Sequence, residues 1–169
     1  MACYDTSLYF DELLPDAESA GDARGAEVVA AEAAAGYAAG HRAFKVKVGR
    51  GARWMDPAAG LDRDVAVMTA VREAIGPDCA LLADANNGFT LNGAQEFPER
   101  TAGLGLGWLE EPFHEDEVLL EALRAWIDHA GLRVELADGE SATLDEGHRL
   151  PLRRGALDPG IRARIRHRA

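Results

Sequence analysis

Short apolar runs alternate along the chain with longer segments whose apolar residues recur every three or four positions. The short runs are typical of buried strands, and the longer segments are typical of helices that bury one face. The pattern predicts strands over residues 2–10, 43–48, 79–84, 107–111 and 132–137. It predicts helices over residues 23–39, 61–75, 91–101 and 117–129, and a further short helix at the capping-box sequence 143–146.

Strands and helices that alternate through short connections form a parallel sheet with right-handed crossovers. The pattern therefore predicts an α/β fold for residues 1–148. Within the helix over 117–129, the spacing predicts that Val118, Leu119, Leu123 and Trp126 face the core.

Charge divides the chain near Arg149. Residues 1–148 carry 28 acidic and 11 basic side chains, a balance of −17, whereas residues 149–169 carry seven arginines and one aspartate. We expect one domain over 1–148 and a disordered, arginine-rich tail over 149–169. The net charge of −11 disfavours nucleic acid as a partner. The two cysteines show no metal-ligand or disulfide spacing and no long apolar run occurs, so we expect a cytoplasmic chain that does not span a membrane.

The strand over 43–48 carries two lysines on one face. Side chains alternate along a strand with a period of two, so Lys45 and Lys47 point the same way. The apolar residues Phe44, Val46 and Val48 point to the opposite face. At a free edge of a sheet, two solvated lysines need no partner. Inside a covered sheet, two neighbouring ammonium groups need carboxylates or a metal-bound substrate opposite them.

Three acidic residues stand at or just beyond the carboxyl ends of predicted strands, namely Asp84, Glu110 and Glu140. Their separations of 26 and 30 residues each match about one strand–helix–strand step, which places them on adjacent strands at one side of the sheet. Three carboxylates in one place repel one another and favour a bound hard cation, and oxygen ligands favour Mg²⁺ over Zn²⁺. Taken singly, each acid has an ordinary interpretation as a turn or strand-end residue. Their coincidence with the two lysines favours a functional site.

The loop after the lysine strand carries Arg50, Arg53 and Trp54. Side chains that follow a strand in this way are placed to contact a substrate. The alternative is a loop that is anchored by one apolar residue.

Four motifs carry a family resemblance, in this order: Lys45-Val46-Lys47, Asp84-Ala-Asn-Asn-Gly88, Leu109-Glu110-Glu111-Pro112 and Ala137-Asp138-Gly139-Glu140-Ser141. They resemble the barrel domain of the enolase superfamily, and more closely its mandelate racemase/muconate lactonizing enzyme branch. The resemblance covers about residues 2–148. It implies a partial TIM-type (β/α) barrel in which this chain supplies about five of the eight strands.

The resemblance implies that Asp84, Glu110 and Glu140 are ligands of Mg²⁺, with Asp138 as the alternative to Glu140. It also implies that Lys47 is the general base that removes a proton α to a carboxylate, with Lys45 as its electrostatic neighbour. The physical logic agrees, because positive charge stabilises the enolate and a cationic neighbour lowers the pKa of a lysine base. The implied substrate is a small carboxylate, such as an acid sugar or a similar hydroxy acid.

Enzymes of this family also have an N-terminal capping domain and three further barrel strands. We therefore expect a truncated or frame-disrupted chain, with self-association through the two open edges of a five-strand partial barrel. Two functions stay open at this point. One is a Mg²⁺-dependent lyase or isomerase of the acid-sugar dehydratase or racemase type, and the other is a non-catalytic remnant that retains metal binding only.

Overall fold

The computed structural model describes residues 4–10, 25–52, 54–114 and 116–138, and it confirms the alternation of strands and helices. The strands are β1 (Asp5–Leu8), β2 (Ala43–Lys47), β3 (Ala80–Asp84), β4 (Leu106–Glu110) and β5 (Glu135–Ala137). The helices are α1 (Glu27–Ala38), α2 (Pro57–Ile75), α3 (Leu91–Arg100) and α4 (Glu117–His129), with short 3₁₀ turns at Arg50–Ala52 and Ala102–Leu104. The predicted short helix at 143–146 and the arginine-rich tail lie outside the described residues.

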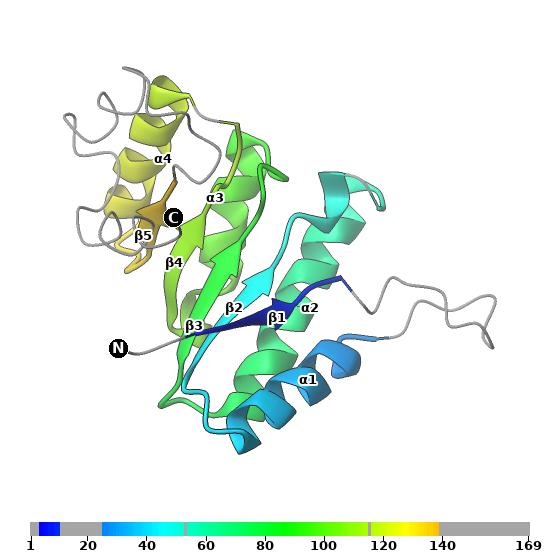
Figure 1. Ribbon diagram of the computed structural model, residues 1–169. Helices are drawn as coiled ribbons and strands as arrows, with labels where there is room; N and C mark the ends of the chain where they lie inside the picture. The colour runs from blue at the N-terminus through cyan, green and yellow to red at the C-terminus, as the bar shows by residue number, and fades with distance from the viewer. Residues whose placement is uncertain (1–3, 11–24, 53, 115, 139–169) are drawn as a thin grey trace, which may run out of the picture.

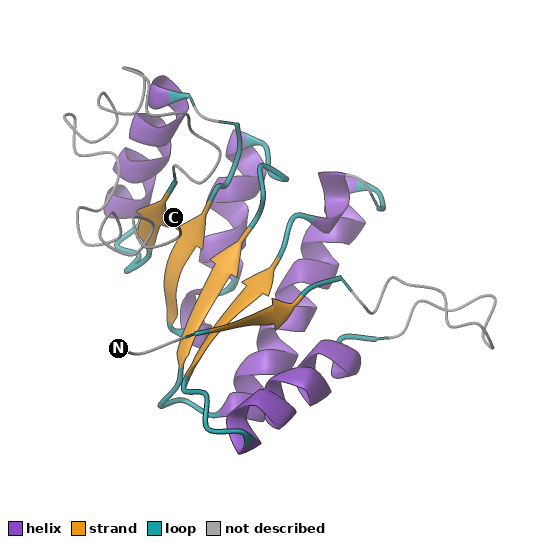
Figure 2. Ribbon diagram, viewed as in Figure 1, coloured by secondary structure: helices purple, strands orange, loops and turns teal. Residues whose placement is uncertain are grey.

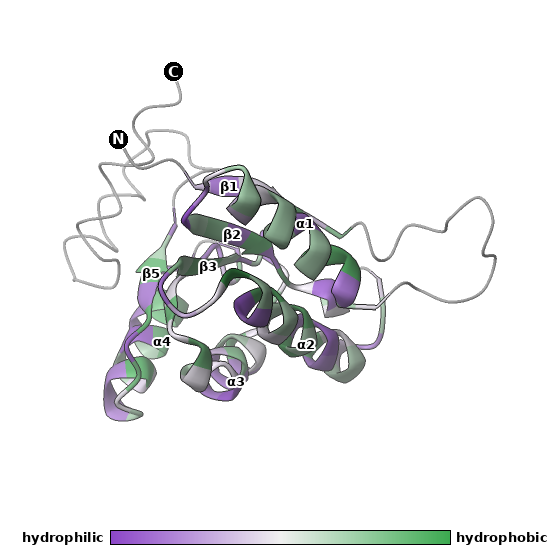
Figure 3. Cartoon of the chain, turned by 90° about the horizontal axis from the view of Figure 1, so that it is seen from below, coloured by the Kyte–Doolittle hydropathy of each residue, from purple (hydrophilic) through white to green (hydrophobic). Residues whose placement is uncertain are grey.

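The five strands form one sheet in the order β1-β2-β3-β4-β5, and every neighbouring pair is parallel (Figures 1 and 2). The helices follow the sheet along one side, with α2, α3 and α4 in an arc (Figure 3). This arrangement confirms the α/β class and is consistent with a partial TIM-type barrel. β1 and β5 are the edges of the described sheet, and association through them stays a prediction. Within the described ranges, no helix is long and apolar enough to cross a membrane.

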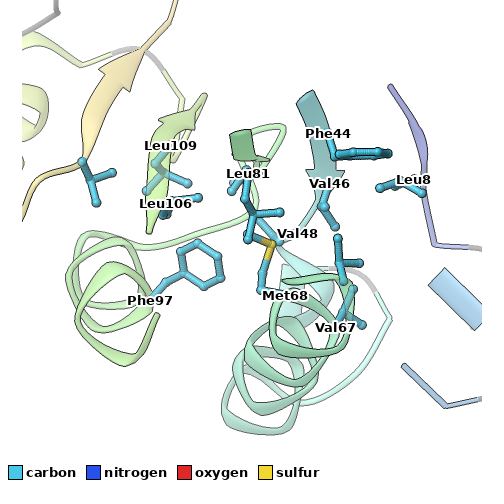
Figure 4. Packing of buried hydrophobic residues seen from close by; sticks show 14 of the residues in the cluster. Leu8, Phe44, Val46, Val48, Val67, Met68, Leu81, Phe97, Leu106 and Leu109 are labelled. Carbon is cyan, nitrogen blue, oxygen red and sulfur yellow. The ribbon is translucent and has the colours of Figure 1, made fainter. Parts of the chain in front are cut away.

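The main core lies between the sheet and the helices. Phe44 and Val46 of β2 and Leu81 of β3 point toward the helices, where Met68 of α2 and Phe97 of α3 meet the sheet (Figure 4). All five side chains are fully buried. Burial of each large apolar side chain contributes about 1.5–3 kcal/mol, so this layer is the main stabilising contact between strands and helices. The alternate residues of the same strands face the opposite side of the sheet, where the predicted site lies.

Helix α2 begins at Pro57, four residues before the predicted start at Leu61. The Asp56 carboxylate accepts hydrogen bonds from the backbone N–H groups of Ala58 and Ala59, at 3.0 and 3.5 Å. Proline is well suited to the first position of a helix, because that position needs no N–H donor. Pro57, which lies outside the predicted helix over 61–75, is therefore the start signal of the helix.

The predicted core face of α4 is wrong in part. Leu120, Leu123 and Ile127 are the buried residues of this helix, whereas Val118 is 62% exposed. Successive residues of a helix are rotated by about 100°, so a stripe that begins at 120 instead of 118 faces a different direction. Leu119 and Trp126 are partly buried and pack against the core, as predicted, so the apolar stripe is centred on Leu123 and Val118 lies outside it.

The loop after β2 is held by a buried ion pair. Arg50 and Asp64 are both fully buried, and Arg50 Nη1 donates to Asp64 Oδ1 at 2.7 Å and to the Lys47 carbonyl at 2.9 Å. Asp64 Oδ2 accepts from the Gly49 N–H at 2.9 Å. Arg50 is therefore a structural anchor of the loop, and its contact with a substrate stays a prediction. Trp54 is 56% exposed, so the loop is not anchored through this residue.

The loops after β2 and β3 meet through two glycines. A Cβ atom on Gly88 would lie 2.8 Å from the Ala85 carbonyl oxygen and 2.9 Å from the Gly49 Cα. Gly49 has a φ of +92°, and a Cβ on it would lie 2.8 Å from the same carbonyl. The close approach of these two backbones fixes the spacing between the ends of the two strands that carry Lys47 and Asp84.

We expect Asp64→Ala to lower the free energy of unfolding by about 3–5 kcal/mol, because it leaves the Arg50 guanidinium buried without its carboxylate. Burial raises the pKa of Asp64, although Arg50 favours the charged form of its carboxylate. The matched control is Asp62→Ala on the same helix, since Asp62 is exposed and pairs with Arg100 at the surface. The control should change stability by less than about 1 kcal/mol. Equal losses in urea unfolding of the two variants would contradict the anchoring role.

We expect Gly88→Ala to destabilise the chain by about 1–3 kcal/mol, because the added methyl group separates two backbones that touch. Gly103→Ala is the control, since nothing lies within 4 Å of a Cβ at that position. Thermal unfolding of both variants measures the difference. A Gly88→Ala variant as stable as the control would show that the two loops tolerate separation.

Candidate metal and acid–base site

Four charged side chains meet at the carboxyl ends of β2, β3 and β4. Lys47 is aligned with Asp84 in the β2–β3 pair, and Asp84 is aligned with Glu110 in the β3–β4 pair. Lys45 lies two residues before Lys47 on the same face. All four residues are buried, with exposed fractions between 0% for Asp84 and 8% for Lys47. The structure therefore brings together both predicted lysines and two of the three predicted acids.

Lys45 bridges the two carboxylates. Its Nζ lies 2.8 Å from Asp84 Oδ2 and donates to both oxygens of Glu110, at 3.0 and 3.1 Å. Lys47 instead donates to Asp84 Oδ2 at 2.6 Å and to Asn86 Oδ1 at 2.5 Å. The acids of the next two strands, Asp84 and Glu110, thus stand opposite the paired lysines.

The electrostatic balance of this site rests on mutual compensation between buried charges. Burial alone would lower the pKa of Lys45, but the hydrogen bond and charge of Asp84, together with those of Glu110, outweigh burial and raise that pKa well above its usual range. Lys45 is therefore a fixed positive charge at neutral pH. Removal of either partner from such a network leaves an uncompensated buried charge.

Asn86 connects the lysine strand to the β4 end. Its side-chain amide donates to Glu111 Oε2 at 3.1 Å while its carbonyl oxygen accepts from Lys47, and its own N–H donates to Asp84 Oδ1 at 3.1 Å. Asn86 and Glu111 both have a φ of +43°, in the left-handed region that non-glycine residues seldom adopt. From the sequence, Asn86 is only one position of the Asp84–Gly88 motif, with no predicted role of its own. Its position two residues after Asp84, in a left-handed turn, is the signal that could have indicated a role here.

Three aromatic residues lie around the charged cluster, and none of them is among the residues predicted for the site. Trp108 Nε1 donates to Glu110 Oε2 at 3.3 Å, and the Tyr4 ring packs edge-on against Trp108 with centroids 5.8 Å apart. Lys45 Nζ lies 5.7 Å from the centre of the Tyr4 ring, and Lys47 Nζ lies 5.5 Å from that of Tyr9. Aromatic faces stabilise nearby ammonium groups. Period two could have placed Trp108 on this face, because it precedes Glu110 by two residues.

Of the two candidates for the third ligand, Asp138 lies within the described residues. Ala137 is aligned with Glu110, so Asp138 begins the segment that follows β5 at the same side of the sheet, and it is 9% exposed. Glu140, the other candidate, lies outside the described residues. Among the residues that the structure describes, no three acidic, histidine or cysteine side chains are grouped closely enough to hold a metal ion.

The described part of the site fits a hard cation. Asp84 and Glu110 offer only carboxylate oxygens, and these oxygens converge within 3.1 Å of a single cationic atom, Lys45 Nζ. Two buried carboxylates that converge on one positive point offer part of the oxygen ligand set of a divalent cation. Oxygen donors without cysteine or histidine select Mg²⁺, Ca²⁺ or Mn²⁺ over softer metals.

Comparison with solved structures gives close matches over most of the chain. A galacturonate dehydratase from a Geobacillus species, in a crystal structure with D-galacturonate and its 5-keto-4-deoxy product, matches with a TM-score of 0.82 and 41% identity. The match covers 93% of this chain and 41% of the dehydratase. A mandelate racemase/muconate lactonizing protein from Geobacillus, complexed with magnesium and tartrate, matches with a TM-score of 0.80 and 40% identity, covering 93% of this chain and 39% of that one.

Comparison with curated proteins and family models agrees. The D-galactarolactone cycloisomerase of Agrobacterium fabrum is 38% identical over 130 residues, which are 76% of this chain and 31% of the relative. The arabinonate dehydratase of Saccharolobus solfataricus is 33% identical over 103 residues, or 61% and 24% of the two chains. This chain thus spans about a third or less of the length of these curated relatives. The family model described as enolase C-terminal domain-like matches residues 28–160, and the chain belongs to that family, in the mandelate racemase/muconate lactonizing enzyme branch of the enolase superfamily.

Proposed function

We propose that this chain carries the metal-binding and proton-abstracting part of an active site that removes a proton α to a carboxylate. The observation that supports the proposal best is the convergence of Lys45, Lys47, Asp84 and Glu110 at the ends of three adjacent strands. The ends of parallel barrel strands are where active sites of this fold lie. The relatives that match include acid-sugar dehydratases and a cycloisomerase.

Asp84 and Glu110 are proposed to hold Mg²⁺ with a third carboxylate from the segment after β5. Glu140 is the proposed third ligand, and Asp138 is the alternative, since it is buried directly after the strand. When bound, Mg²⁺ supplies Lewis-acid stabilisation of the negative charge that develops on the substrate carboxylate. Magnesium is present in the Geobacillus complex that matches this chain.

Lys47 is proposed to be the general base. Its Nζ lies at the carboxyl end of β2. Asn86 Oδ1 and Asp84 Oδ2 both accept hydrogen bonds from it and so fix its position. A lysine takes a proton from carbon only as the neutral amine, so Lys47 must give up one of these contacts before it acts. Lys45, whose ammonium group lies beside Lys47 on the same face of β2, is proposed to supply positive charge near the reacting carbon.

The proposed substrate is an acid sugar or a similar small hydroxy acid. The substrates named for the matching relatives, galacturonate, arabinonate and galactarolactone, are of this class. A substrate carboxylate is matched by the two ammonium groups and the proposed cation. The proposed reaction is therefore of the lyase or isomerase type, beginning with removal of the α-proton.

We expect the chain to bind Mg²⁺, and both Asp84→Asn and Glu110→Gln to weaken that binding by at least about tenfold, because each change removes a charged oxygen donor. Isothermal titration calorimetry with MgCl₂ measures the affinity. Asp62→Asn on the exposed face of α2 is the matched control, since it removes one negative charge far from the site. Equal affinities for all four proteins would contradict the assignment of Asp84 and Glu110.

We expect the Mg²⁺-loaded chain to exchange the α-proton of an acid sugar for deuterium in D₂O, as measured by proton NMR on a panel that includes galacturonate and arabinonate. Lys47→Ala should abolish the exchange while Mg²⁺ binding is retained, because the base is lost but the oxygen ligands remain. Exchange that is unchanged in Lys47→Ala would contradict the role of Lys47. Mg²⁺ binding without exchange by the unmodified chain would favour the alternative function, in which the chain binds the metal only.

A further inference from the structure

Lys45 and Lys47 are the only lysines in the chain, in which the other basic residues are arginines and histidines. Both are in β2, and both are buried against the carboxylates of neighbouring strands. Their contacts differ, however. Lys45 reaches Asp84 and Glu110 together, whereas Lys47 reaches Asp84 and the neutral amide of Asn86.

The position of Lys45 Nζ is the point on which the proposed metal ligands converge. Three carboxylate oxygens, one from Asp84 and two from Glu110, lie between 2.8 and 3.1 Å from this nitrogen. A Mg²⁺ ion needs its oxygen ligands at about 2.0–2.1 Å. The same oxygens cannot surround the ion and the ammonium group at the same time, and two cations this close repel each other strongly in a buried site.

We propose that Lys45 is a built-in counter-cation that holds the metal-binding carboxylates together in the metal-free chain and leaves them when Mg²⁺ binds. This inference rests on the proposed metal site at Asp84 and Glu110. Lys45 holds the two carboxylates in place before the metal binds, but it also competes with Mg²⁺ for them, so Mg²⁺ must displace its ammonium group. Each buried carboxylate is compensated in both states, first by Lys45 and then by Mg²⁺.

Displacement of Lys45 couples the binding of Mg²⁺ to the binding of a carboxylate ligand. An ammonium group released from Asp84 and Glu110 stays near the strand ends, beside Tyr4, whose ring already lies 5.7 Å from it. The freed charge is then available to a carboxylate ligand that enters the site. Mg²⁺ and a carboxylate ligand should therefore bind with positive cooperativity, because the metal makes Lys45 available to the anion.

The contrast between the two lysines supplies the test. Lys45→Met and Lys47→Met each remove one positive charge from the same face of the same strand. If only the general charge of the site mattered, both changes would strengthen Mg²⁺ binding equally. Displacement of a bridging ammonium predicts a larger gain for Lys45→Met, of about tenfold, because this change removes the ammonium group that contacts both carboxylates, whereas Lys47 contacts Asp84 alone of the two. Lys45→Arg keeps the charge and should bind Mg²⁺ no more tightly than the unmodified chain.

The experiment combines calorimetric titration of Mg²⁺ with thermal unfolding in EDTA and in saturating Mg²⁺. We expect Lys45→Met to bind Mg²⁺ most tightly, to unfold at a lower temperature than the unmodified chain in EDTA, and to recover that difference in Mg²⁺. Equal gains in affinity for Lys45→Met and Lys47→Met, or no gain for Lys45→Met, would overturn the inference while leaving the metal site in place. Loss of Mg²⁺ binding by every protein, the unmodified chain included, would overturn the metal site and the inference together.

A second measurement follows the two lysines in the unmodified sequence and uses a variant only to assign their signals. Uniform ¹³C labelling of lysine gives two ε-carbon signals from the chain, which Lys47→Arg assigns by removing one of them. During a titration with MgCl₂, the Lys45 signal should shift more than the Lys47 signal, because only Lys45 leaves two carboxylates. Mg²⁺ binding that leaves the Lys45 signal in place would show that its ammonium group is not displaced.

Discussion

The arrangement of the site depends on mutual compensation between charges that are buried at the ends of three parallel strands. Asp84 is fully buried and lies within 2.8 Å of both lysine ammonium groups, and Glu110 is bound by one of them. A buried carboxylate without a partner is strongly destabilising, so each strand end constrains what its neighbours carry. The parallel register supplies the alignment, because Lys47, Asp84 and Glu110 occupy matching positions on consecutive strands. The same parallel register therefore determines both the sheet and the grouping of the charged side chains at the carboxyl ends of its strands.

Much of the arrangement at these strand ends could be predicted from the sequence, because the signals that indicate it are local and periodic. Period-two alternation placed Lys45 and Lys47 on one face, and the spacing of about one strand–helix–strand step placed Asp84 and Glu110 on adjacent strands. The same signals predicted all five strands within a few residues. Where boundaries moved, as at the start of α2, the cause was a capping aspartate followed by a proline at the first helical position.

Other contacts could not be predicted, because they join residues whose proximity only the folded chain defines. In the sequence, Asp64 is one of the polar residues expected on the exposed face of a helix. In the structure it is fully buried against Arg50 and holds the loop that follows the lysine strand. Asn86 was interpretable as an ordinary turn residue, although its amide links Lys47 to Glu111. Periodicity indicates which face a residue occupies, but it does not indicate which distant side chain meets it there. Two of the contacts that position the site are therefore visible only in three dimensions.

The central claim is that Asp84 and Glu110 form one cation site beside the two lysines. Diffraction from crystals of the chain soaked in Mn²⁺, which accepts the same oxygen ligands as Mg²⁺ and scatters anomalously, tests this most directly. An anomalous peak is expected within coordination distance of Asp84 and Glu110, with the Lys45 ammonium group moved away from both carboxylates. A fully occupied Mn²⁺ site elsewhere in the chain, with Lys45 still bridging Asp84 and Glu110, would contradict the claim.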